Sequence, residues 1–425
     1  MGREGEGFNV EKSYFSEFVK DLEAKLALIT GAGGVVPVDS PNADYPFGLE
    51  EVRRPVLVLG LPGIGKTCGI KATIEKLNKT LPPEKKLGFK KTLLGQTVVG
   101  SMEGIPVVDP NTGNAVRVQI PDLPNPEKDG EYGVYFLDEI TTADAAQVQP
   151  ALGLADDSRN IGEYTLPEHW LVVSAGNGDD CANFLELADM TINRFSVYDI
   201  SYDYARDWKP WALNNKIDEM IIAFLNFSPD TCCRVESTDL DRAGKQFPSP
   251  RSWTRLSAEL AMRKSMGREV TQAELPAFAS RIIGSKAANE FAAFCAFKSK
   301  VNYTPEAICN GTEKDPDNMQ EEVFHIILEQ TMKFLNRNVK CDSFENATKE
   351  EIKYIGEAVK WFIKFEQFDV EKTINAIVEI TRLGANGLFG KIVINNQDYI
   401  ALYPEYDSFL DKHFEAISEV INDYV

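Results

Sequence analysis

The sequence predicts an α/β fold with a mainly parallel sheet in the first half of the chain, followed by a helical second half. Three observations lead to this prediction. Short apolar segments alternate with helical segments up to about residue 200, as expected of strands joined by crossover helices. A glycine-rich loop at residues 60–67 joins the first apolar segment of this series to a helix. After residue 203 the strand signals fade, and helical periodicity replaces them.

The sheet is expected to contain five strands, at residues 55–59, 89–94, 134–137, 170–174 and 197–200. Continuous apolar segments of this length indicate strands that are buried on both faces, which is typical of a covered parallel sheet. Two further segments, 105–118 and 159–166, place turn-forming residues between short β-prone stretches and predict two hairpins. Residues 11–29 have apolar side chains at helical spacing and predict an amphipathic helix.

The second half of the chain is expected to be helical at residues 205–227, 250–264, 272–299, 319–337, 345–366, 370–383 and 406–423. Residues 302–318 are rich in Asn, Asp, Pro and Gly, and predict a loop between two helical parts. The segment from 354 to 368 contains more aromatic and aliphatic side chains than a disordered acidic tail has. We therefore expect the C-terminal part to be a folded helical module.

The most informative motif is the octapeptide Gly-Leu-Pro-Gly-Ile-Gly-Lys-Thr at residues 60–67, called the phosphate loop below. It lies between a buried strand and a helix, the context that a phosphate-binding loop requires. Glycines let successive N–H groups turn toward a phosphate, and the helix N-terminus adds partial positive charge. We expect Lys66 to reach the phosphates and Thr67 to ligate Mg²⁺. The residues expected to bind the nucleotide are Gly60, Pro62, Gly63, Ile64, Gly65, Lys66, Thr67 and Cys68.

A pair of acids, Asp138 and Glu139, directly follows the apolar segment 134–137. An aspartate at the end of a buried strand can hold Mg²⁺, usually through water, and the adjacent glutamate can polarise an attacking water. An ordinary turn with two acids is the simpler alternative. The position of the pair, about 70 residues after Lys66 with one strand between, favours the catalytic interpretation. We therefore expect Asp138 to serve the metal and Glu139 to be the catalytic base.

Three more polar residues follow in series. Asn177 comes directly after the strand at 170–174 and is placed to lie between the γ-phosphate and the water, although such a residue is often only part of a turn. Arg194 precedes Phe195 and is a candidate finger that completes a neighbouring subunit's site. Arg251 follows a Ser-Pro helix start. A cation is unfavourable there unless an anion such as a γ-phosphate, or one of the chain's many acids, compensates it.

Composition and charge limit the function classes. The chain has 425 residues, 43% of them hydrophobic, and a formal net charge of −20. A general nucleic-acid binder usually presents a basic face, so this charge argues against a nucleic-acid partner. The seven cysteines form no C-x-x-C pair and fit reduced thiols in a cytoplasm. Because the sequence has no signal-peptide pattern and no apolar run of membrane-spanning length, we expect a cytoplasmic protein.

With these five motifs in order, the chain resembles the AAA+ ATPases, specifically the MoxR-like branch and its dynein- and midasin-related cousins. The motifs stand in this sequence as Gly60–Thr67 (Walker A), Leu137–Glu139 (Walker B), Ser174–Asn177 (sensor 1), Asn193–Phe195 (arginine finger) and Ser249–Arg251 (sensor 2). The two expected hairpins are similar to the helix-2 insert and the pre-sensor-1 hairpin of that branch. The resemblance covers roughly residues 30–300.

The resemblance implies a P-loop AAA+ domain with a five-stranded sheet and a helical lid, with ATP and Mg²⁺ at a subunit interface of a ring, expected to be a homo-hexamer. Its regions are expected at 1–30 (N-terminal helix), 31–203 (nucleotide-binding domain), 204–300 (lid) and 301–425 (acidic helical extension, outside the resemblance).

The implied function is ATP hydrolysis that remodels or matures a client protein, with a von Willebrand A domain protein as the expected partner. Two alternatives stay open at this point. One is a nucleic-acid motor or restriction-type NTPase subunit, which the acidic composition of residues 95–130 disfavours because Arg117 and Lys128 are the basic residues there. The other is a nucleotide-gated scaffold with little turnover.

Overall fold

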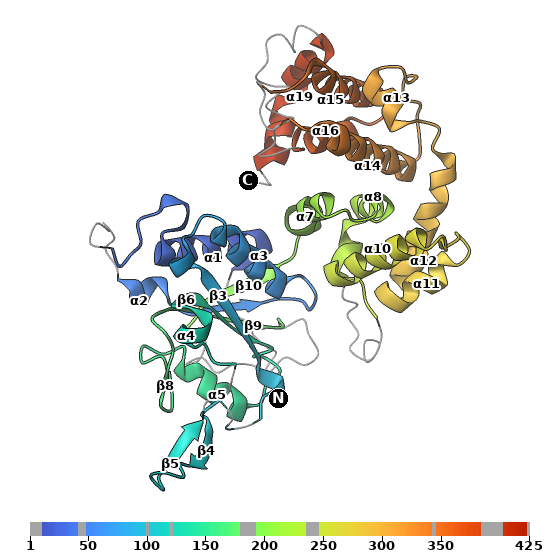
Figure 1. Cartoon of the computed structure of the whole chain (residues 1–425). Helices are drawn as coiled ribbons and strands as arrows, with labels where there is room; N and C mark the ends of the chain where they lie inside the picture. The colour runs from blue at the N-terminus through green and yellow to red at the C-terminus, as the bar shows by residue number, and fades with distance from the viewer. Residues whose placement is uncertain are drawn as a thin grey trace, which may run out of the picture. The chain divides into compact units, whose positions relative to one another are not determined.

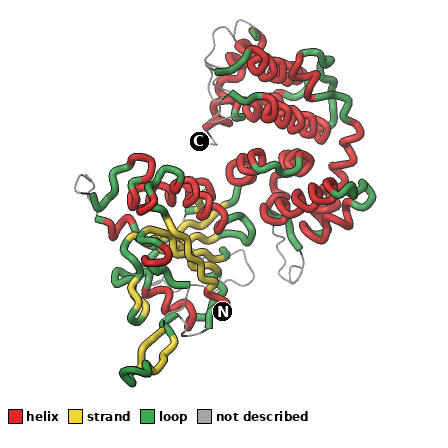
Figure 2. The backbone as a smooth tube through the Cα atoms, viewed as in Figure 1, coloured by secondary structure: helices red, strands yellow, loops and turns green. Residues whose placement is uncertain are grey.

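The computed structural model describes residues 11–40, 48–98, 100, 102–118, 122–178, 193–234, 246–341, 346–383 and 403–422. The chain divides into two compact units, Met1–Asp203 and Tyr204–Val425. The first is an α/β unit and the second is helical, as the strand and helix colours of Figure 2 show. Each unit is described by itself.

A parallel sheet of six strands forms the centre of the first unit (Figure 1). The strand order is β1-β10-β2-β9-β6-β3. The strands are β1 (Lys12–Tyr14), β2 (Val56–Leu59), β3 (Leu87–Leu93), β6 (Tyr132–Asp138), β9 (His169–Gly176) and β10 (Ser196–Ser201). All four side chains of β2 are almost completely buried, as expected of a strand covered on both faces. The prediction of an α/β fold with a parallel sheet is therefore confirmed.

The predicted number of five strands is wrong, because β1 is a sixth strand at the edge of the sheet. Residues 12–14 pair with residues 199–201 of β10, whereas the sequence predicted that the N-terminal helix began at residue 11. The helix α1 begins at Phe15. The Tyr14 N–H donates to the Glu17 carboxylate at 2.8 Å and closes its first turn. A three-residue edge strand has no apolar pattern of its own, so the sequence does not reveal it.

Helices cover the sheet. Those of the first unit are α1 (Phe15–Thr30), α2 (Leu49–Val52), α3 (Lys66–Asn78), α4 (Pro126–Asp129) and α5 (Ala145–Gly153), with 3₁₀ turns η1 (Ala32–Gly34), η2 (Pro83–Lys85) and η3 (Leu94–Gln96). Helices α1 and α3 pack together, and each also contacts strands of the sheet. Leu57 and Leu59 belong to a core cluster that also contains Val148 and Leu152 of α5. Because side chains alternate along a strand, Val56 and Val58 point to the opposite face.

Both predicted hairpins are confirmed. The first pairs β4 (Ile105–Val108) with β5 (Ala115–Val118), and the second pairs β7 (Asn160–Ile161) with β8 (Tyr164–Thr165). Figure 1 shows the β4–β5 ribbon projecting from the α/β unit. All residues of its two strands are exposed, so the rest of the described unit does not bury these strands.

The second unit is helical. Its elements are η4 (Tyr204–Trp208, a π-helical turn), α7 (Lys209–Asn214), α8 (Glu219–Phe227), η5 (Pro229–Cys233), α10 (Pro250–Ser265), α11 (Leu275–Ile283), α12 (Ser285–Cys295), η6 (Ala296–Lys300), α13 (Pro305–Asn310), α14 (Glu321–Asn338), α15 (Lys349–Ile363), η7 (Lys364–Gln367), α16 (Val370–Thr381) and α19 (Pro404–Asn422). Three predictions need correction. The helix expected at 272–299 is divided at Gly284, which has a φ of +82° and separates α11 from α12. The helix expected at 205–227 is interrupted before α8, where Asp218 accepts the Met220 N–H at 2.9 Å as an N-cap. The loop expected at 302–318 contains α13, which starts with Pro305.

Buried charges join helices on both sides of residue 300 within this unit. Glu329 of α14 is only 2% exposed and accepts a hydrogen bond from Asn226 of α8. Lys209 of α7 is also buried and pairs with Glu379 of α16. Burial raises the pKa of the Glu329 carboxyl to about 7, although the positive charge of Lys209 acts in the opposite direction. Among the described residues, no helix is both long and apolar enough to cross a membrane.

Candidate functional site

The register of the sheet brings the ends of three central strands to one edge, called the carboxyl edge below. Leu59 pairs with Gly176, and Leu137 with Ser174. Because all the strands are parallel, the segments that follow β2, β9 and β6 leave the sheet side by side. The phosphate loop follows β2, Asn177 follows β9, and the acid pair stands at the end of β6. Three of the motifs expected from the sequence therefore meet at this edge. Ligands of open α/β sheets bind outside the carboxyl ends of the strands.

Two glycines give the phosphate loop its shape. Gly63 and Gly65 have φ values of +86° and +106°, a region that side chains with a Cβ rarely adopt. Gly60 is required for space, since a Cβ there would lie 2.9 Å from Cδ1 of Ile64. Ile64 is itself buried, which anchors the middle of the loop. The positive φ values of Gly63 and Gly65 are typical of a nest, a main-chain conformation that binds phosphate.

Lys66 is the cation of the loop. It begins α3, and its Nζ donates to the carbonyl oxygens of Gly60 at 2.6 Å and Leu61 at 3.2 Å. The ammonium group is therefore held over the loop, where it can exchange carbonyl partners for phosphate oxygens. Thr67 and Cys68 follow in the first turn of the helix, and the Cys68 side chain is exposed.

The acid pair lies at the end of β6 in a strained main chain. Glu139 has a φ of +62°, one of three described non-glycine residues with positive φ. Its N–H donates to Oδ1 of Asp138 at 3.0 Å, a contact that helps to hold this conformation. The Glu139 side chain is exposed. A Cβ at Gly95 would lie 3.6 Å from Oε2 of Glu139, so the segment after β3 approaches the Glu139 carboxylate closely.

Asn177 is tied to the acid pair through Thr141. The Asn177 N–H donates to Oγ1 of Thr141 at 2.8 Å. Thr141 is completely buried, and it fits against Gly176, where a Cβ would come within 2.5 Å of it. On the other side, a Cβ at Gly178 would lie 3.8 Å from the Gly60 nitrogen. Asn177 therefore lies between the phosphate loop and the acid pair.

The oxygens at this edge fit Mg²⁺. The Thr67 hydroxyl and the Asp138 carboxylate are hard oxygen ligands, and Mg²⁺ in nucleotide sites takes one or two such groups and completes its shell with phosphates and water. Among the described residues, no group of three His, Cys, Asp or Glu side chains could hold a metal alone. The donor set therefore suits a metal that binds with a nucleotide.

Arg194 lies at the opposite edge, called the amino edge below. It precedes β10, whose Ser196 pairs with Val56 at the start of β2. At a rise of roughly 3.3 Å per residue, the four residues of β2 place about 13 Å of sheet between this edge and the phosphate loop. Nε of Arg194 contacts Oδ1 of Asp156 at 2.9 Å, and Arg54 donates to the Asn193 carbonyl at 2.9 Å. The structure therefore does not bring Arg194 to the site of its own subunit.

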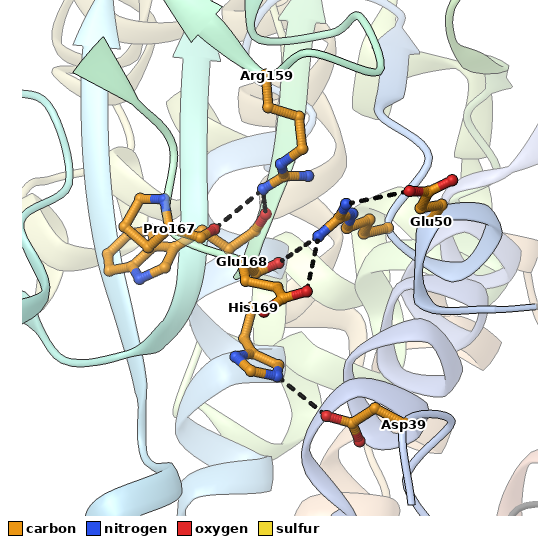
Figure 3. Close-up of polar contacts among 8 residues, drawn as sticks. Asp39, Glu50, Arg159, Pro167, Glu168 and His169 are labelled. Atoms are coloured by element: carbon orange, nitrogen blue, oxygen red, sulfur yellow. Dashed lines mark hydrogen bonds and ion pairs between the residues drawn. The ribbon is translucent and has the colours of Figure 1, made fainter. Parts of the chain in front are cut away.

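Other arginines of the amino edge hold main-chain carbonyls (Figure 3). Arg159 is buried, and its guanidinium donates to the carbonyls of Pro167 and Trp170. Burial, together with the neighbouring Arg53, lowers the pKa of Arg159 to about 10, so it stays charged at neutral pH. Arg53 donates to the Glu168 carbonyl at 3.2 Å. These two arginines fix the segment that leads into β9.

Arg251 belongs to the second unit. As expected from the sequence, it lies in the first turn of α10, where Ser249 is the N-cap and Pro250 the first helical residue. Its side chain is exposed. Its predicted role at the γ-phosphate stays a prediction.

Three contacts at the two edges were not predicted from the sequence. They involve Lys91, which pairs with Asp138, Thr141, which binds Asn177, and Asp156, which pairs with Arg194. Of these, Lys91 has a usable signal, because a lysine within a strand of a covered parallel sheet needs a partner. Thr141 and Asp156 lie in ordinary polar turns of the sequence.

No protein-family model matches this sequence, and no curated protein matches it. Solved structures similar to this chain include Cdc6p from Pyrobaculum aerophilum, at 13% identity over 65% of this chain and 69% of that chain, with a TM-score of 0.36. A mutant RuvB from Thermotoga maritima matches at 14% identity over 75% of this chain and 89% of its own, with a TM-score of 0.31. Hsp104 with ATPγS and casein matches at 14% identity over 67% of this chain and 47% of its own, with a TM-score of 0.31. The α/β P-loop fold rests on this chain's own parallel sheet and phosphate loop.

Proposed function

We propose that this chain is a Mg²⁺-dependent AAA+ ATPase of the MoxR-like type. The observation that carries the proposal is the register of β2, β9 and β6, which supports a single site built from the phosphate loop, Asn177 and the acid pair. A loop of this shape followed by a lysine binds a nucleotide phosphate chain. An acid pair at the end of β6, with only β9 between it and the strand of the loop, adds what a binding site alone does not need, a base for water.

Each residue of the site has a separate role in nucleotide binding or hydrolysis. Lys66 leaves the loop carbonyls and binds the phosphates, while Thr67 and Asp138 offer oxygens to the metal. Mg²⁺, when bound, neutralises charge that develops on the phosphoryl oxygens. Glu139 accepts a proton from the attacking water. Asn177, held by Thr141, positions that water near the γ-phosphate.

Arg194 acts in a neighbouring subunit's site. Its place at the amino edge supports this role, because the length of the strands separates it from its own phosphate loop. A ring in which the amino edge of one copy meets the carboxyl edge of the next would supply the missing cation. We propose a homo-hexamer of this kind, with Arg251 binding the γ-phosphate as well.

The client is proposed to be a protein, with a von Willebrand A domain protein as partner. A net charge of −20 disfavours a phosphate-backbone partner. Arg117, a basic residue of the β4–β5 hairpin, lies 3.7 Å from the Glu103 carboxylate and is already compensated. These charges disfavour the alternative of a nucleic-acid motor.

Phosphate release and ATP binding, measured side by side, test the proposal. Glu139→Gln should bind ATP like the wild type and lose about 10²–10⁴-fold in hydrolysis, because an amide fits the site but cannot accept the proton. Glu163→Gln, at an exposed glutamate of the second hairpin, is the matched control and should stay fully active. Wild-type protein that binds no ATP, or a Glu139→Gln variant as active as the wild type, would contradict the proposal. ATP binding without turnover in assembled rings would favour the scaffold alternative.

A further inference from the structure

The carboxylate that is proposed to serve Mg²⁺ already has a cation beside it. Nζ of Lys91, on β3, lies 2.6 Å from Oδ2 of Asp138, and the other oxygen of Asp138 accepts the Glu139 N–H. The lysine and aspartate side chains are 30% and 19% exposed. Asp138 is therefore bonded on both oxygens and largely shielded from water.

The strand register directs Lys91 to Asp138, and it directs the adjacent Lys90 elsewhere. Lys91 pairs across the sheet with Phe136, two residues before Asp138, and its Nζ lies 5.5 Å from the centre of that ring. Side chains alternate along a strand, so Lys90 points to the other face. There Nζ of Lys90 lies 3.3 Å from Asp129, in an ion pair with almost the same exposure as the first. One strand thus carries two comparable lysine–aspartate pairs, of which one reaches the acid pair.

We propose that Lys91 is a positioning residue that acts as the built-in counter-ion of Asp138 and keeps free divalent cations off this carboxylate. The inference rests on the proposed function of Asp138 as a metal-serving group. A divalent cation that approaches Asp138 alone meets a positive charge and a carboxylate whose two oxygens each already accept a hydrogen bond. The phosphates of a nucleotide bring several negative charges and further oxygens, which Mg²⁺ needs to complete its shell. Metal therefore enters this site together with the nucleotide and not before it.

Binding of Mn²⁺ without nucleotide, followed by electron paramagnetic resonance of the free ion, tests the inference on the full chain. Mn²⁺ is a suitable probe because it also prefers carboxylate and water oxygens. Lys91→Met should bind Mn²⁺ at least about tenfold more tightly than the wild type. Lys90→Met, which removes the matched ion pair, should leave the affinity unchanged. The double variant Lys91→Met/Asp138→Asn should lose the gain.

Equal Mn²⁺ affinity of the wild type and Lys91→Met would overturn the inference, as would an equal gain in Lys90→Met. Circular dichroism checks that each variant is folded, and Lys91→Gln replaces Lys91→Met if the latter does not fold. Binding of ATP by the wild type in the presence of Mg²⁺ is measured separately. Its absence would refute the proposed function and leave the Mn²⁺ comparison standing, so the two failures are distinguishable.

Discussion

The cations at the two edges of the central sheet have different partners. At the carboxyl edge, Lys66 holds carbonyls of its own loop and Asp138 holds Lys91, both partners that a nucleotide with its metal can replace. At the amino edge, arginines hold carbonyls and three acids of their own subunit. Under the proposed function, one subunit would carry two half-sites, one that binds phosphates and one that offers a cation, separated by the length of the strands.

Within the amino edge, burial separates two roles. Arg159 is 6% exposed, and its hydrogen bonds end on main-chain carbonyls, so it is a structural residue. The Arg194 side chain is 33% exposed, and it pairs with Asp156, whose side chain is 41% exposed. Half-exposed ion pairs of this kind contribute little to stability and exchange partners easily. Under the proposed function, such a pair would let Arg194 leave Asp156 for a neighbour's phosphate.

The largest contrast between the edges is expected in nucleotide affinity. Lys66→Ala should weaken ATP binding by about 2–5 kcal/mol, because it removes a charge-assisted contact to the phosphates. Arg194→Ala should leave the affinity of the isolated subunit nearly unchanged, since the residue lies at the other edge. Titration calorimetry on both variants measures this. Equal losses in both would place the two residues in one site and break the comparison.

A smaller contrast is expected in stability. Arg159→Met should lower the free energy of unfolding by about 2–4 kcal/mol, because two buried carbonyls lose their donor. Arg194→Ala should cost no more than about 1 kcal/mol, as expected for a half-exposed pair. Urea denaturation of the two variants supplies the measurement. If Arg194→Ala proved as destabilising as Arg159→Met, the assignment of Arg194 to function would lose its support.

The smallest expected effect concerns Cys68, next to the phosphate loop. Its side chain is exposed, so a bound nucleotide should slow its alkylation severalfold, while Cys341, a partly exposed thiol of the second unit, should react at an unchanged rate. Mass spectrometry of alkylated peptides with and without Mg·ATP gives both rates. Unchanged labelling of Cys68 at saturating ATP would mean that the nucleotide does not cover this part of the loop.

The sequence predicted those parts of the site that are encoded locally. The phosphate loop, Asp138–Glu139 and Asn177 each follow a buried strand, and parallel strands bring their ends to one edge. The partners of these residues could not be predicted in the same way. Lys91 and Asp138 are 47 residues apart, and their contact depends on the register of β3 on β6. Strand β1 was missed because three edge residues show no apolar alternation.

The positive φ of Glu139 could not be predicted either. In this conformation the Glu139 N–H donates to the Asp138 carboxylate, and that carboxylate is itself paired with Lys91. Similarly, the sequence motif marked Arg194 as a finger but did not show its pair with Asp156. The domain boundaries at 30 and 300 stay predictions. Residues 12–30 join the α/β unit, and the buried charges of Lys209 and Glu329 connect helices across residue 300.

The most direct test of the account mixes two inactive variants, Arg194→Ala and Glu139→Gln. In an equimolar mixture, about a quarter of the head-to-tail interfaces would join a subunit with intact Glu139 to a neighbour with intact Arg194. Part of the wild-type ATPase activity should therefore return, because a finger supplied in trans is worth about 10³–10⁵ in rate in other nucleotidases. If mixed rings form and no mixture recovers activity, the two edges do not complete each other across subunits, and the central claim is contradicted.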